Sequence, residues 1–280
     1  MSGSITLENR FGVNKMELIS LKYAIFVIVL LVLYYCFPKK YRWYVLLAGS
    51  MAYYVIICKW YVLFIIFTIC TTYGSTIWID KLLKEQNAVV KSHKEDWDRQ
   101  TRKEYKEKGR KKRVAVMLFA LLCNFGILAF LKYIPYAGEL GLLLPLGISF
   151  YTFQSMGYVM DVYREIVEPE KNFLKVALFV SFFPQIIQGP IAIYDKLAGQ
   201  LYEGHSLRLE NLQKGALLVL WGVMKKLVIA DRAVNIINFV MDKPMDFSGT
   251  YVFFAAVVYA LQLYADFSGG IDIVRGIAEM

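Results

Sequence analysis

Charged side chains are scarce in this sequence. They make up 20% of its 280 residues, whereas hydrophobic side chains make up 58%. Soluble proteins use roughly 45–50% apolar residues and about 25% charged ones. Proline is also rare, with seven residues, so a proline-rich low-complexity chain is excluded. This composition is typical of an integral membrane protein and excludes most soluble folds.

Motifs for metal binding and for thiol redox chemistry are absent. The sequence has two histidines and four cysteines, and no two cysteines form a CxxC pair. Zinc and dithiol sites depend on such pairs or on neighbouring histidines. We therefore expect no metal site and no tightly bound cofactor. The cysteines lie in or at the ends of apolar runs, where packing is their expected role: Cys36, Cys58, Cys70 and Cys123.

Positive charge is concentrated in one polar segment. The net charge is +9, and residues 80–113 contain thirteen basic and seven acidic side chains. A basic segment between apolar runs is typical of a membrane-flanking loop and argues against a nucleic-acid groove. The simpler interpretation is a solvated, largely helical connector on the anionic inner leaflet. A docking site for a soluble partner is the alternative.

Long uncharged runs predict the membrane spans. A helix needs about 20 apolar residues to cross a hydrocarbon layer of ~30 Å. We expect an all-α, multi-spanning helical bundle that forms a single domain over residues 1–280. Two further segments, 172–194 and 215–230, are expected to be broken or interfacial, because the first contains two prolines and the second contains two lysines. The six expected spans are 18–37, 43–58, 60–79, 114–131, 140–160 and 247–265.

Basic residues in the short loops predict the orientation. Lys39, Lys40 and Arg42 follow the first span, and the segment 80–113 follows the third. Basic loops stay on the cytoplasmic side. Both signals therefore predict that the N-terminus lies outside the cell and that 80–113 is cytoplasmic. No small-residue cleavage site follows the first apolar run, so we expect an uncleaved span.

Polar residues in the apolar segments form three groups. Gln154 lies on the same helical face as Tyr158 and Asp161, either as a site or as part of an aromatic-rich core helix. Non-helical backbone in a membrane needs protein or water around it. The string PQIIQGP, with Gln185 and Gln188, therefore predicts a re-entrant element, with a kinked helix as the alternative.

The third group lies in the string ALQLYADFSGGIDI. Gln262, Asp266 and Asp272 fall within eleven residues of one another, and we expect Ser268–Gly270 to loosen the chain between them. Two carboxylates beside an apolar span are costly unless they face a cavity. They are expected to bind a cation or a proton, as in transporters, or to orient a substrate that carries hydroxyl groups.

Four strings, taken in order, resemble the membrane-bound O-acyltransferases, in the bacterial branch that O-acetylates exported polysaccharides. The resemblance covers about residues 20–280. It implies a ring of transmembrane helices around a tunnel, in the bacterial plasma membrane, with an acyl group moving from a cytoplasmic donor to hydroxyls of an exported glycan or cell-wall polymer. The strings are PLGISFYTFQSMGYVMDVYR, PEKNFLKVALFVSFFPQIIQGPI, WGVMKKLVIADR and YALQLYADFSGGIDI.

The resemblance also implies a catalytic histidine that acts as a general base. In this branch it lies in an aromatic, Arg-rich segment after the DFSG block, so we expect it beyond Met280 and the domain to be incomplete at its C-terminus. His93 and His205 lie in polar stretches without a matching motif. We therefore expect these 280 residues alone to lack the catalytic base.

The resulting prediction is an O-acyltransferase whose acyl donor is acyl-coenzyme A or a carrier-bound acyl thioester. Expected partners are membrane lipid, the polymer acceptor, and an acyl carrier or an extracellular acetylation protein. The alternatives are a transporter or flippase subunit and a non-catalytic scaffold of an export complex. The residues expected to line the tunnel are Gln154, Gln185, Gln188, Gln262, Asp266 and Asp272.

Overall fold

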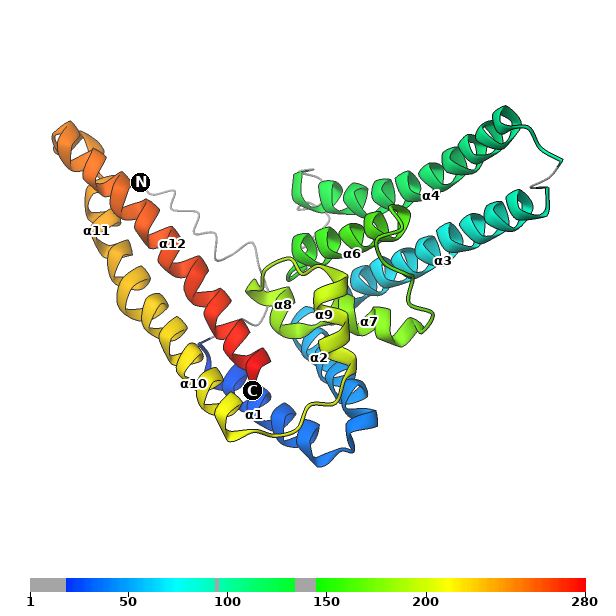
Figure 1. The fold of residues 1–280 in the computed structure, drawn as a ribbon. Helices are drawn as coiled ribbons and strands as arrows, with labels where there is room; N and C mark the ends of the chain where they lie inside the picture. The colour runs from blue at the N-terminus through cyan, green and yellow to red at the C-terminus, as the bar shows by residue number, and fades with distance from the viewer. Residues whose placement is uncertain (1–18, 94–95, 134–144) are drawn as a thin grey trace. The chain divides into compact units, whose positions relative to one another are not determined.

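The computed structural model describes residues 19–93, 96–133 and 145–280, and within these ranges the chain is helical and has no β-strand (Figure 1). The described residues fall into two compact units. The first contains 43–183 and 191–204, and the second contains 19–42, 184–190 and 205–280. Each unit is built by helices that pack side by side.

The first unit is organised around one long helix, α3, against which α4, α6 and α7 pack. A core of Trp43, Leu178, Phe182 and Leu201 joins its remaining helices. The helices are α2 (Arg42–Cys58), α3 (Val62–Ser92), α4 (Arg99–Tyr133), α6 (Ile148–Tyr163), α7 (Phe173–Ser181) and α9 (Tyr194–Tyr202), with a 3₁₀ turn, η3 (Lys59–Tyr61), between α2 and α3.

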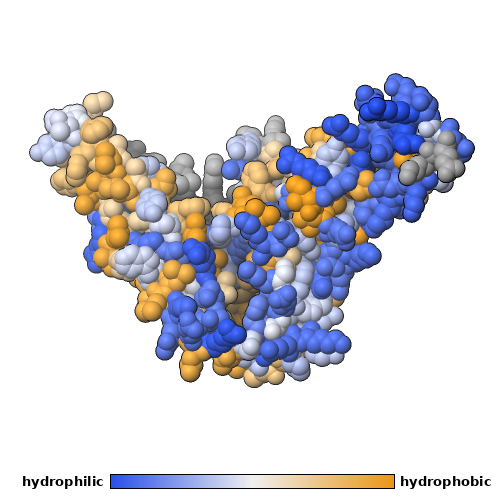
Figure 2. Space-filling view, in the orientation of Figure 1, coloured by the Kyte–Doolittle hydropathy of each residue, from blue (hydrophilic) through white to orange (hydrophobic). Residues whose placement is uncertain are grey.

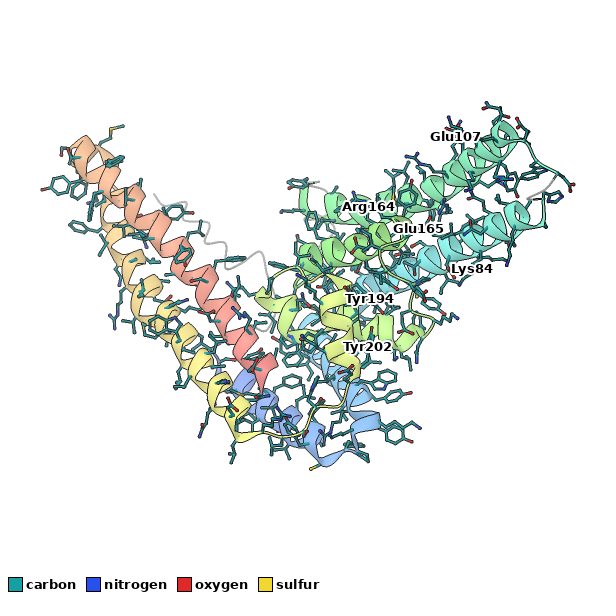
Figure 3. All side chains as sticks on the ribbon, viewed as in Figure 1. Lys84, Glu107, Arg164, Glu165, Tyr194 and Tyr202 are labelled. Carbon is teal, nitrogen blue, oxygen red and sulfur yellow. The ribbon has the colours of Figure 1, made fainter. Side chains whose placement is uncertain are left out.

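Tyrosines of α9 pack against other helices of this unit (Tyr194 and Tyr202 are labelled in Figure 3). The ring of Tyr194 stacks on that of Tyr158 at 4.1 Å. The hydroxyl of Tyr202 donates to the backbone oxygen of Lys175 at 2.9 Å. Burial raises the pKa of both Tyr194 and Tyr202, so both hydroxyls stay protonated.

The second unit is a helical hairpin with α1 beside it. Its first arm is one continuous helix in three parts, and its second arm, α12, runs back along the whole of it. The elements are α1 (Leu21–Cys36), η2 (Lys39–Tyr41), α8 (Phe183–Gln188, from Pro184 on), α10 (Leu209–Met224), a π-helical turn η4 (Lys225–Ala230), α11 (Asp231–Met241), η5 (Pro244–Asp246) and α12 (Gly249–Glu279).

The helices confirm a multi-pass membrane protein. Among the described residues, three segments are long and apolar enough to cross a bilayer: Lys39–Ser92, Arg99–Tyr133 and Gly249–Glu279. The first contains two of the expected spans. Two others, Leu21–Cys36 and Phe173–Gln188, are apolar but shorter. The expected span 140–160 corresponds to α6, and its beginning lies outside the described residues.

The basic segment 80–113 is mostly helical, as expected for a connector. It consists of the last turns of α3 and the first turns of α4, joined by the short stretch between Ser92 and Arg99. The Gln86 side chain donates to the Lys106 carbonyl at 3.3 Å, and a Cβ at Gly109 would meet Gln86 Oε1 at 2.3 Å. The two helices therefore stay paired beyond their apolar parts. Figure 2 shows hydrophilic surface over these outer ends.

The helix after Asn172 is broken, as its prolines predicted. α7 ends at Ser181, and Phe182 has ψ of 107°, outside the helical range. Pro184 has no N–H, and its ring would clash with the carbonyl of Val180 in a continuous helix. In the first turn of a new helix, α8, proline is well tolerated. Whether this element is re-entrant stays a prediction.

Two buried side chains satisfy the backbone groups that the break separates. In an unbroken helix the Phe183 N–H would bind the Phe179 carbonyl. Instead the Phe183 N–H donates to Ser50 Oγ at 3.2 Å, and the Phe179 carbonyl accepts from Gln154 Nε2 at 2.7 Å. Buried backbone groups almost always have partners. Gln154 and Ser50 therefore fix the position of the break.

We expect Gln154→Met to lower the free energy of unfolding by about 1–3 kcal/mol, because the buried Phe179 carbonyl would lose its donor. Ser50→Ala is expected to have a similar effect through the Phe183 N–H. Denaturant titration in detergent measures both. Gln213→Met, at an exposed position of α10, is the control and is expected to change stability by less than about 0.5 kcal/mol. Equal losses at Gln154 and Gln213 would contradict this assignment.

Candidate functional site

Two lysine–aspartate ion pairs join the arms of the helical hairpin in the second unit. Lys225 Nζ lies 2.6 Å from Asp272 Oδ2. Lys226 Nζ pairs with Asp266 Oδ1. All four side chains are largely withdrawn from solvent, with exposed fractions from 14% to 32%. The two lysines in an apolar segment and the two carboxylates beside an apolar span thus neutralise one another.

Glycines bring the backbones of α10 and α12 into direct contact beside these pairs. A Cβ at Gly222 would lie 2.5 Å from the Gly269 carbonyl oxygen, and one at Gly269 would lie 2.8 Å from that of Gly222. Gly215 and Gly276 form an equivalent contact two turns away, at 2.5 and 2.6 Å. Small residues at helix interfaces are typical of close helix packing in membranes. We call these four residues the glycine seam.

The seam corrects one expectation from the sequence. Ser268, Gly269 and Gly270 do not loosen the chain, because α12 is helical without interruption from Gly249 to Glu279. The glycines serve close approach, and the packed neighbour α10 compensates for their low helix propensity.

Both lysines of these ion pairs lie in a π-helical turn of the first arm. Lys225 and Lys226 are the first two residues of η4. Single π-helical turns are rare and occur frequently at functional sites. Adjacent side chains on a helix diverge, and the aspartates lie six residues apart, about 9 Å along α12. Lys226 therefore pairs with Asp266, which precedes Gly269, and Lys225 pairs with Asp272, which follows it.

The glutamines of α8 and α12 lie around Asp266. Gln188 Nε2 donates to the Asp266 carbonyl at 3.5 Å, a long contact. The Gln188 side chain packs on Gly270, where a Cβ would lie 2.3 Å from its amide atoms. Gln262 is half-buried one helical turn before Asp266, on the same face of α12. The structure thus brings Gln188 to the Asp266 backbone and places Gln262 one turn from Asp266 on α12.

Gln185 has one satisfied and one unsatisfied amide atom. Its Nε2 donates to the Pro190 carbonyl at 2.6 Å. Its buried Oε1 has no hydrogen-bond partner among the described residues. Each buried polar atom without a partner needs an explanation, such as a water or a bound polar group. Gln185, within α8, therefore offers a hydrogen-bond acceptor.

Gln154 belongs to the first unit, and its side-chain amide donates a hydrogen bond to the Phe179 carbonyl. The predicted tunnel role of all six residues stays a prediction. Lys225 and Lys226 were not among the site residues predicted from the sequence. The signal was present, because two lysines in one apolar helix and two aspartates in another are costly unless they pair.

The polar groups suit the binding of hydroxyls more than the binding of ions. Both carboxylates already have ammonium partners, so their negative charge is compensated. Asp266, Gln188 and Gln262 together offer carboxylate and amide atoms, which accept and donate hydrogen bonds to hydroxyl groups. Neither histidine belongs to this group: His93 stacks on Trp97 at the end of α3, and the His205 carbonyl accepts from Arg42.

Comparison with known proteins finds relatives among bacterial polymer O-acetylating enzymes. The peptidoglycan O-acetyltransferase of Helicobacter pylori is 32% identical over 199 aligned residues, which cover 58% of this chain and 38% of that protein. A probable alginate O-acetylase of Pseudomonas syringae is 36% identical over 140 residues, covering 49% and 26%. That of Pseudomonas aeruginosa is 34% identical over 141 residues, covering 50% and 26%. No family model matches the chain.

These relatives confirm the resemblance to membrane-bound O-acyltransferases that the four sequence blocks indicated. The matched part of this chain spans between about a quarter and two fifths of the length of each relative.

Proposed function

We propose that this chain is part of a bacterial membrane-bound O-acyltransferase that transfers an acetyl or other acyl group to hydroxyls of an exported polysaccharide or cell-wall polymer. The observation that carries the proposal is a convergence in the second unit. PQIIQGPI, WGVMKKLVIADR and YALQLYADFSGGIDI belong to three of the four family-like blocks, and they supply α8, the π-helical turn and α12. Distant blocks that meet at one polar cluster favour a shared site.

The cluster would bind and orient the acceptor. Asp266 and the amides of Gln188 and Gln262 would hold polymer hydroxyls, while Lys225 and Lys226 keep the carboxylates neutralised. In the transfer the acceptor oxygen attacks the thioester carbonyl, the C–S bond breaks, and the proton passes to a general base. No residue of the cluster is assigned as that base. The donor would be acyl-coenzyme A or a carrier-bound thioester.

The proposed orientation places the N-terminus outside the cell and the outer ends of α3 and α4 in the cytoplasm. Lys39 and Lys40 precede α2, and Arg42 is its first residue. The thirteen basic residues of segment 80–113 form the other basic region. Both would then face the cytoplasm, as basic loops do. A cysteine scan with a membrane-impermeant maleimide on intact cells tests this topology.

We expect Asp266→Asn to reduce polymer O-acylation at least tenfold. The polymer hydroxyls would lose a charged carboxylate as their hydrogen-bonding partner, and Lys226 would lose its ion-pair partner. The measurement is base-released acetate from the polymer of cells that carry the full-length gene. Asp242→Asn, an exposed residue after α11, is the matched control and is expected to retain activity. Ion-coupled flux that Asp266→Asn abolishes, without any loss of ester, would instead indicate a transporter.

A further inference from the structure

One exposed face of the outer half of α4 carries only basic side chains. Arg99, Lys103, Lys106 and Arg110 are all exposed and follow one another at intervals of four, three and four residues. On an α-helix these positions lie within an arc of about 60°. We call these four residues the basic stripe. The chain adds no acidic residue to this arc.

The remaining faces of the same turns have mixed charge. Glu104 and Glu107 lie outside the arc, four residues before Lys108 and Lys111 respectively (Glu107 is labelled in Figure 3). This Glu-to-Lys spacing stabilises helices. The faces outside the arc therefore have the pattern of an ordinary solvated helix, with Glu107 bordering the arc beside Arg110. Within the arc itself all four side chains are basic.

The stripe opposes the stability of its own helix. Like charges at such spacing destabilise a helix by roughly 0.2–0.5 kcal/mol per pair. Positive charge near a helix N-terminus is also unfavourable because the macrodipole is positive there. Within the described residues, no carboxylate forms an ion pair with Arg99, Lys103 or Lys106. An external anionic partner would remove both penalties.

The length of α4 carries the stripe away from the lipid. The uncharged part of the helix, 114–131, is long enough to cross most of the hydrocarbon layer. The preceding part from Arg99 continues the same helix for about another 22 Å. Surface potentials of membranes decay within a Debye length of about 8 Å. Lipid headgroups would therefore reach Arg110 and leave Arg99 and Lys103 in solution.

Contacts with neighbouring parts of the chain hold the helix that carries the basic stripe in place. Gln86 of α3 fills the space at Gly109, and Trp97 contacts both His93 and Tyr105 at the end of the hairpin. At the base of the stripe, Tyr163 and Glu107 lie near the Arg110 guanidinium. The four charges thus keep a fixed spacing, which a solvated tail would not provide.

We propose that the basic stripe is a docking surface for a soluble protein that presents an acidic helix. Carboxylates at positions i, i+4, i+7 and i+11 of such a helix match the four basic side chains, and because the intervals of the stripe read the same in both directions, either helix polarity fits. The contact would be electrostatic and salt-sensitive. It goes beyond the proposed acyl transfer and does not depend on it.

The test measures binding of a defined probe to the full-length protein in nanodiscs of neutral phosphatidylcholine. The probe is a fluorescein-labelled helical peptide of about 20 residues with glutamates at i, i+4, i+7 and i+11. Its isomer carries the same glutamates distributed around the helix. The stripe variant is Arg99→Gln with Lys103→Gln and Lys106→Gln. The control, Lys108→Gln with Lys111→Gln and Lys112→Gln, removes the same charge from other faces.

Fluorescence anisotropy at low salt is expected to show about tenfold weaker binding for the stripe variant and less than about threefold for the control. The isomer peptide is expected to bind more weakly than the probe. Equal losses in both variants, or equal binding of both peptides, would overturn the proposal in favour of attraction by net charge. Stripe-dependent binding to phosphatidylglycerol vesicles without peptide binding would identify a membrane contact instead. Acylation activity in both variants separates failure of this proposal from failure of the enzyme.

Discussion

Alanine at Gly222 is expected to lower the unfolding temperature of the protein in detergent and to abolish the proposed polymer acylation. The added Cβ would stand 2.5 Å from the Gly269 carbonyl oxygen, a backbone atom that cannot rotate away. The helices α10 and α12 would have to separate, and overpacking of this kind costs about 1–3 kcal/mol. Gly269→Ala is expected to act similarly, since its Cβ would meet the Gly222 carbonyl at 2.8 Å. Differential scanning fluorimetry measures the first effect.

Gly249→Ala provides the matched control on α12. No atom lies within 4 Å of a Cβ at that position, and alanine has a higher helix propensity than glycine. We expect its unfolding temperature to equal or slightly exceed that of the wild type. If Gly222→Ala unfolds at the wild-type temperature as well, the backbone contact between α10 and α12 does not exist.

The glycine seam and the ion pairs depend on each other. A Cβ at Gly269 would lie 3.2 Å from the Cβ of Lys225, so the Lys225 side chain begins directly beside the glycine seam. Lys225 and Lys226 reach Asp272 and Asp266 because the two helices approach this closely. A substitution in the seam therefore displaces the charges of the site as well as the helices, which is why we expect activity to fall further than stability.

Local signals predicted the parts of the fold that local physics decides. Pro184 predicted a break after Asn172, because proline cannot continue a helix, and the break lies at Phe182. The mixed charges of 80–113 predicted a helical connector, which the outer ends of α3 and α4 form. The side chains that stabilise the break were not predicted, since Ser50 and Gln154 are distant from Phe182 in sequence.

The interpretation of Ser268–Gly270 was wrong for a related reason. Glycine indicates flexibility when a chain is considered alone. Here Gly222, more than forty residues earlier, determines its role, because two facing glycines permit backbone contact. The pairing of Lys225 with Asp272 is equally non-local. Helix-to-helix register decides both features, and composition within a single window carries no information about that register.

Removal of one partner of the Lys225–Asp272 pair is expected to destabilise the protein more than removal of both. Lys225→Met leaves Asp272, only 14% exposed, without its cation. Loss of one member of a buried pair costs up to about 3–5 kcal/mol, and the partial exposure of this pair reduces our expectation to about 2 kcal/mol. The double variant Lys225→Met with Asp272→Leu removes the isolated charge and is expected to recover most of that loss. A double-mutant cycle of unfolding free energies measures the coupling.

The same helix supplies the control for this cycle. Lys214 and Glu210 form an ion pair of similar length, 2.7 Å, but their side chains are 62% and 72% exposed. Lys214→Met is expected to change stability by less than about 0.5 kcal/mol, because water solvates the remaining glutamate. Equal losses of stability in Lys214→Met and Lys225→Met would mean that water also solvates Asp272 once Lys225 is removed. The carboxylates would then lie in contact with bulk water, and the neutralised polar cluster that supports acceptor binding would be absent.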